Sequence, residues 1–124
     1  MNPRRVHELM RRNFPSVDLA AHGWINVCES AGLNVVRFQE VVDRYFSADH
    51  LLVDVHRKLD AFLPRQEAIR FVAAHAGQGQ IRISDREFTS FVVLALNGVA
   101  TGWGRDSAVV AGLPRISLTI SLDG

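Results

Sequence analysis

Histidine and aspartate occur close together in the stretch HLLVDVH, residues 50–56, which suits metal or acid–base chemistry. On a helix, His50 and Asp54 would lie one turn apart, whereas His56 would point about 240° away from His50. A zinc-protease helix carries two histidines at positions i and i+4, and this stretch lacks that pair. We therefore expect no metal site and interpret the stretch as the solvated face of a helix.

Other reactive residues also lack the neighbours that catalysis requires. Cys28 falls on the expected apolar side of a helix, where a free cysteine usually behaves as a small hydrophobic residue. The alternating hydroxyl residues from Ser117 to Ser121 resemble no nucleophile elbow. Gly77-Gln78-Gly79 precedes an expected strand, which is the wrong order for a dinucleotide-binding loop. We expect no catalytic residue and no cofactor, and we interpret the chain as a protein other than an enzyme.

The start of the chain is basic, with Arg4, Arg5, Arg11 and Arg12 against Glu8 alone. Four arginines could contact phosphates, but no helix-turn-helix pattern follows them and no aromatic residues alternate with them. We interpret them as the solvated face of a helix and expect no direct contact with nucleic acid. The alternative is a contact surface for an acidic patch on another protein.

The middle of the chain is slightly acidic, and carboxylates on adjacent helices would attract a basic partner. Aromatic residues dominate interface hot spots, so Tyr45 and Trp103 are candidate anchors, although Trp103 could equally belong to the core. The expected partner-binding residues are Glu40, Asp43, Asp49, Asp54, Asp60, Tyr45 and Trp103.

Apolar residues recur at helical spacing through most of the first 76 residues. Asn2-Pro3 opens a helix that ends at Pro15, and Asn34 caps another that runs to residue 46. Three more helices are expected: from Ser16 or Asp18 to Gly32, over residues 52–63, and from Pro64 to residue 76.

From residue 80 the period changes to two, which is typical of strands. Strands are expected at residues 81–84, 91–96, 99–103 and 116–122, with Asn97-Gly98 as a hairpin turn between the second and the third. The fold class is therefore α+β, with N-terminal helices packed on a C-terminal antiparallel sheet of about four strands. The last strand is also a candidate for edge pairing with a partner or a second copy, so a homo-oligomer remains open.

Length and composition indicate one globular domain over residues 1–124. The chain has 48% apolar residues, a formal net charge of +1 and the single cysteine Cys28, which excludes an internal disulfide. The longest apolar run, residues 91–96, is too short to span a bilayer, and no secretory signal is recognised. We expect a cytoplasmic protein of bacterial type with no membrane partner.

The stretch FTSFVVLALNGVATGWG, residues 88–104, and the order of helices followed by strands resemble immunity proteins of bacterial contact-dependent growth-inhibition toxin systems. This resemblance implies a non-enzymatic inhibitor that binds and neutralises a cognate, cytoplasm-acting toxin. The expected toxin is basic and a nuclease. Two alternatives remain: a small enzyme or toxin that uses His50, His56 or His75 with an arginine, and a specific secretion chaperone.

Overall fold

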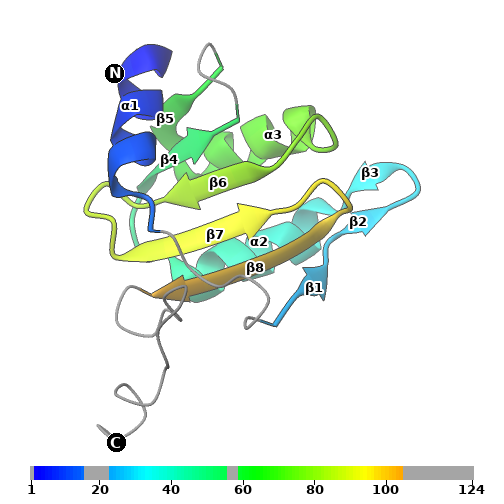
Figure 1. Ribbon diagram of the computed structural model, residues 1–124. Helices are drawn as coiled ribbons and strands as arrows, with labels where there is room; N and C mark the ends of the chain where they lie inside the picture. Colours follow the sequence, from blue (N-terminus) through cyan, green and yellow to red (C-terminus); the bar gives the residue numbers. More distant parts are fainter. Residues whose placement is uncertain (1, 16–22, 56–58, 105–124) are drawn as a thin grey trace, which may run out of the picture.

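The computed structural model describes residues 2–15, 23–55 and 59–104. Within these ranges, three helices and eight strands follow one another in mixed order (Figure 1). They are α1 (Pro3–Asn13), β1 (Ile25–Asn26), β2 (Cys28–Glu29), β3 (Gly32–Leu33), α2 (Val35–Tyr45), β4 (His50–Asp54), β5 (Ala61–Pro64), α3 (Arg65–His75), β6 (Ile81–Ser84), β7 (Ser90–Leu94) and β8 (Val99–Gly104).

Six strands form one antiparallel sheet in the order β1-β8-β7-β6-β4-β5. The β7–β8 hairpin turns at Asn97-Gly98, where Gly98 has a φ of 89° that a glycine adopts without strain. β2 and β3 make a separate two-stranded hairpin. Among the described residues, β1 and β5 are the edge strands of the large sheet.

Helices cover both faces of this sheet (Figure 1). α2 and α3 lie on one face over a core that includes Phe38, Ile69 and Val92. α1 lies on the opposite face, where Val6 and Met10 pack on a second core with Phe91 and other residues. Because both faces are covered, β4 and β7 carry continuous apolar runs rather than alternating apolar and polar residues.

Several expected elements are confirmed. The side chain of Asn2 accepts a hydrogen bond from the backbone N–H of Arg5 and caps α1, and Asn34 caps α2 in the same way through Arg37. α3 also forms, although Pro64 is its N-cap and not its first residue. The strands expected near residues 81–84, 91–96 and 99–103 are β6, β7 and β8.

The helix expected over residues 52–63 is wrong, because its described ends form the antiparallel pair β4 and β5. Leu51 and Val53 face the core under α2 and α3, whereas Leu52 faces α1. A strand buried on both faces presents a continuous apolar run, and such a run also satisfies helical spacing. Apolar residues at spacings of three and four therefore do not indicate a helix in a segment that is buried on both faces.

The helix expected to end at Gly32 is also wrong in its described part, since residues 25–33 form β1, β2 and β3. Its first residues, 16–22, and the strand expected at 116–122 lie outside the described residues. The α+β class is confirmed, with two corrections. The part of the chain that the structure describes has six strands in the sheet instead of about four, and its helices are interleaved with strands and cover both faces. No helix within the described ranges is both long and apolar enough to cross a membrane.

Candidate functional site

Three side chains from distant parts of the chain meet beneath α1. The Nδ1 atom of His7 lies 3.0 Å from Oδ2 of Asp60 and 3.2 Å from Oδ1 of Asp54. Arg82 joins them through an ion pair with Oδ2 of Asp54. Asp60 is fully buried and Asp54 is 5% exposed. These four residues, His7, Asp54, Asp60 and Arg82, are called the His7 cluster below.

Strand geometry explains why the cluster forms. Leu52 pairs with Phe62 across β4 and β5, and both contribute to the core under α1. Side chains alternate along a strand, so Asp54 and Asp60, two positions further along that register, face α1 as well. Asp54 is also the cross-strand partner of Arg82 on β6. The strand pairing therefore gathers two carboxylates and a guanidinium on the face that α1 covers.

Arg82 is held in place by two kinds of contact. Its Nε donates a 2.8 Å hydrogen bond to Oδ2 of Asp54, and its guanidinium lies 5.2 Å from the ring centroid of Phe14 at the end of α1. Phe14 in turn packs edge-on against Phe91 and Trp103. The cluster is thus attached to the apolar core under α1 through a cation–π contact.

The two carboxylates have opposite electrostatic environments. Burial raises the pKa of Asp60 to about 7 from an ordinary 3.8, and the hydrogen bond with Asp54 and its negative charge add to that rise. Burial also acts to raise the pKa of Asp54, but the Asp60 hydrogen bond and the Arg82 charge outweigh it and lower this pKa below 3.8. Asp54 is therefore the ionised member of the pair, and Asp60 is the member that holds a proton below about pH 7.

The structure divides the five carboxylates expected on one partner-binding surface. Glu40 and Asp43 are exposed on α2, and Asp49 is exposed in the segment after it. Oδ1 of Asp43 forms a 2.7 Å ion pair with Arg65. Asp54 and Asp60 lie in the interior, because β4 and β5 direct them beneath α1. In this structure only the first three can offer their carboxylates to a partner, so the expected set is corrected to two separate groups.

The two aromatic candidates also differ. Trp103 is 2% exposed and packs in the core under α1, which answers the open question of its place. Tyr45 is half-buried at the end of α2, where its ring packs over Gly102 of β8. The guanidinium carbon of Arg44 lies over this ring, 5.6 Å from its centroid. Tyr45 is the one of the two that retains an accessible surface.

A groove of about 450 Å³ runs between the edge strand β1 and α2. It is lined by Ile25, Asn26, Arg37, Glu40, Val41 and Arg44. Next to it, Val36 is 69% exposed at the start of α2, and Ile25 and Val35 are also exposed. Val36, Glu40 and Asp43 follow one another at spacings of four and three, so they share the outer face of the helix. This face combines the exposed side chain of Val36 with two acidic groups, and Arg37 and Arg44 add positive charge in the adjoining groove.

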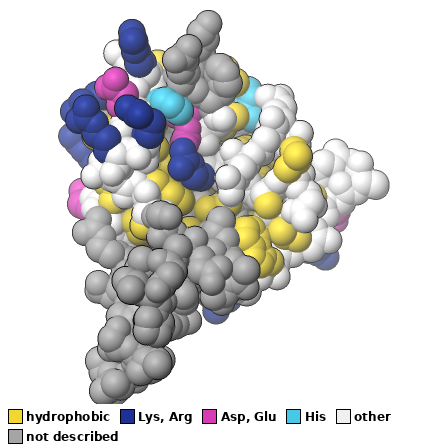
Figure 2. All heavy atoms as spheres, in the orientation of Figure 1, with side chains coloured by type: hydrophobic (Ala, Val, Ile, Leu, Met, Phe, Trp, Pro, Cys, Tyr) yellow, Lys and Arg dark blue, Asp and Glu magenta, His cyan; other side chains and the backbone are white. Residues whose placement is uncertain are grey.

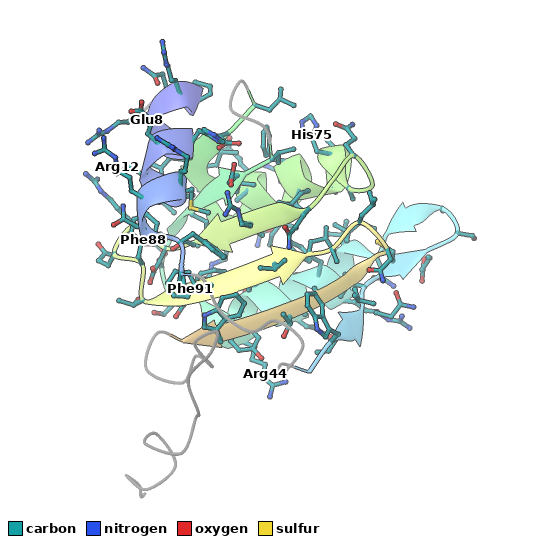
Figure 3. All side chains as sticks on the ribbon, viewed as in Figure 1. Glu8, Arg12, Arg44, His75, Phe88 and Phe91 are labelled. Atoms are coloured by element: carbon teal, nitrogen blue, oxygen red, sulfur yellow. The ribbon has the colours of Figure 1, made fainter. Side chains whose placement is uncertain are left out.

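The arginines of α1 lie on the opposite side of the molecule's sheet. Arg4, Arg5, Arg11 and Arg12 are exposed, and basic side chains gather over α1 in Figure 2. Figure 3 shows Glu8 and Arg12 on the outer side of α1, and Arg44 below β8, away from α1. The basic face and the groove on α2 are therefore separate surfaces.

Two of the three histidines considered for acid–base chemistry, His50 and His75, are described and lie on different elements. His50 begins β4 and its ring lies 5.4 Å from that of Phe62. His75 ends α3, packs on Phe71 at 4.7 Å and contacts Gln78. His56 lies outside the described residues. The histidine that the structure brings to Asp54 is His7.

Sequence reasoning did not single out His7 or Arg82. His7 lies in the arginine-rich stretch that was interpreted only as a solvated face, and Arg82 was seen as the polar position of an alternating strand. The sequence indicated this site only through Asp54 and Asp60, which lie at the ends of two segments that could form a hairpin. The interpretation of residues 52–63 as a helix excluded that hairpin.

No protein-family model, curated protein or solved structure matches the chain.

Proposed function

We propose that this protein is a non-enzymatic immunity protein that binds and neutralises a cytoplasm-acting toxin through the outer face of α2. The observation that carries the proposal is the exposed apolar and charged face formed by Val36, Glu40 and Asp43 beside the groove of about 450 Å³. Protein interfaces combine an apolar centre with a polar rim, and this face offers both. The basic face of α1 offers charge without comparable exposed apolar residues.

The expected partner is a protein toxin, and a nuclease is the class that the resemblance of residues 88–104 implies. Glu40, Asp43 and Asp49 would attract the basic groups that nucleases use to bind polyphosphate. Arg37 and Arg44 flank Glu40 in the groove, so the partner must also offer acidic or carbonyl groups there. Action inside the cytoplasm is part of the same proposal.

Co-expression with the product of the adjacent upstream reading frame tests this function. The tagged chain is expected to co-purify with that product in a fixed stoichiometry and to suppress its toxicity. A chain that emerges alone beside a harmless neighbour would overturn the proposal. A complex that forms without suppressing toxicity would reject the immunity role.

A further inference from the structure

The donor atoms of His7, Asp54 and Asp60 all lie within 4.8 Å of one another. The two separations from the imidazole nitrogen are 3.0 and 3.2 Å. Zinc binds nitrogen and carboxylate oxygen at about 2.0–2.2 Å, so neighbouring ligand atoms in its tetrahedral shell lie roughly 3.3–3.6 Å apart. The observed separations are slightly shorter than these edges, so the three side chains need only a small outward movement to hold an ion.

Each carboxylate is also oriented by a second donor. Arg82 holds Oδ2 of Asp54, which leaves Oδ1 directed at His7. The backbone N–H of Val55 donates a 2.7 Å hydrogen bond to Oδ1 of Asp60, which leaves Oδ2 directed at His7. Metal ligands are characteristically oriented by such outer hydrogen bonds. One oxygen of each carboxylate, Oδ1 of Asp54 and Oδ2 of Asp60, thus converges on the same imidazole nitrogen.

We propose that His7, Asp54 and Asp60 form a binding site for one divalent transition-metal ion, with Zn²⁺ as the best-fitting ion. The imidazole donor favours Zn²⁺ over Mg²⁺ and Ca²⁺, which prefer sites built from oxygen alone. Two carboxyl groups face one guanidinium in the cluster, and a divalent cation would displace the Asp60 proton and bind both as carboxylates. Three protein ligands leave coordination positions for water, as in an open zinc site.

The surface provides a path for the ion. The His7 side chain is 29% exposed, whereas both carboxylates lie beneath it. In Figure 2, histidine, acidic and basic side chains lie next to one another on the surface near α1. A bound ion would connect α1 to the β4–β5 hairpin across 53 positions of the sequence. Because such an ion binds only the folded chain, it would stabilise the fold by mass action.

Calorimetric titration of the chelator-treated full chain with Zn²⁺ tests the site. One equivalent is expected to bind the wild-type protein. Since even outer partners of a metal site contribute about 10- to 100-fold in affinity, His7→Asn is expected to weaken binding by about 100-fold or more. The matched control is His75→Asn, an imidazole removed from the end of α3, which is expected to bind as the wild type does. Absence of binding to the wild type, or equal affinity in His7→Asn, would overturn the site.

A measurement on the unmodified chain covers the case in which His7→Asn fails to fold. Mn²⁺ added in substoichiometric amounts to the ¹⁵N-labelled protein broadens the signals of nuclei near the bound ion. The site predicts that the His7 ring and the Val55 and Asp60 amides broaden first. Broadening that begins at His50 or His75 would locate the ion elsewhere and refute the proposal.

Discussion

His7 and Asp60 are 53 positions apart in the chain, yet Nδ1 of His7 lies 3.0 Å from Oδ2 of Asp60. Their contact joins α1 to the residue that directly precedes β5. Asp54 and Arg82 complete the group from two further strands. One buried polar cluster therefore connects α1, β4, β5 and β6, and its partners should respond to mutation as a unit.

The raised pKa of Asp60 predicts a pH dependence of stability in metal-free buffer. Between about pH 4 and pH 7 the folded chain keeps a proton on Asp60, whereas the unfolded chain, with a pKa near 3.8, loses it. The contribution of Asp60 to the unfolding free energy therefore falls as pH rises through this window. The lowered pKa of Asp54 acts only when pH falls below its ordinary value of 3.8.

Asp60→Asn should remove this fall, because its amide imitates the protonated carboxyl. Urea denaturation at pH 5 and pH 8 measures the effect, with His7 and Arg82 unchanged. Asp49→Asn, at an exposed carboxylate, is the control, and its unfolding free energy should change between pH 5 and pH 8 as that of the wild type does. If the unfolding free energy of Asp60→Asn also changes with pH as in the wild type, the raised pKa of Asp60 is contradicted.

Arg82→Met should destabilise the protein by about 3 kcal/mol, because it leaves the buried Asp54 without its cation. The Arg82 side chain is 34% exposed, so the loss should fall toward the lower end of the range for buried pairs. Adding Asp54→Asn should recover part of this loss, since the unpaired charge is then removed. A double-mutant cycle by urea denaturation gives the coupling, with Arg70→Met on α3 as the control. If the changes in unfolding free energy of Arg82→Met and Asp54→Asn simply add in the double variant, Arg82 and Asp54 are not coupled.

Gly102→Ala should be destabilising, although Gly102 has an ordinary backbone conformation. A Cβ atom there would overlap Cδ2 of Tyr45, and overpacking of this kind costs about 1–3 kcal/mol. Gly23→Ala is the matched control, because a Cβ at that position meets nothing within 4 Å. Thermal unfolding compares the two variants. A Gly102→Ala protein as stable as Gly23→Ala would mean that Tyr45 does not pack on β8 in this way.

Arg65→Lys should cost about 2 kcal/mol despite the retained charge. The guanidinium donates to the carbonyl oxygens of Phe46 and Ala48 and to Oδ1 of Asp43, and so ties the end of α2 to the start of α3. A lysine cannot reproduce this planar set of donors, and carbonyls left unsatisfied are costly. Arg70→Lys on the exposed side of α3 should change stability little. Chemical denaturation of both variants distinguishes the loss of geometry from the loss of charge.

The sequence predicted those elements whose local signals agree with their final environment. α1 and α2 have asparagine caps and one apolar side each, and β7 and β8 flank an Asn-Gly turn. β4 was missed because Leu51, Leu52 and Val53 are buried on two different faces, and periodicity does not separate such a strand from a helix.

The candidate site depended on that missed strand. Asp54 and Asp60 look like solvated helix residues until β4 and β5 pair, and only the packing of α1 across the sheet brings His7 to them. Contacts between residues so distant in sequence are set by tertiary packing, which no local pattern encodes. By contrast, Glu40 and Asp43 were correctly expected on an exposed helix, because α2 is a short amphipathic element with a clear cap.

The central claim, that the outer face of α2 neutralises a toxin, is tested most directly by growth protection against the product of the adjacent upstream reading frame. Val36→Arg combined with Glu40→Arg should abolish protection while leaving the fold intact, because both side chains are exposed. Glu67→Arg, an exposed charge reversal on α3, should protect as well as the wild type. Full protection by the α2 double variant would contradict the claim.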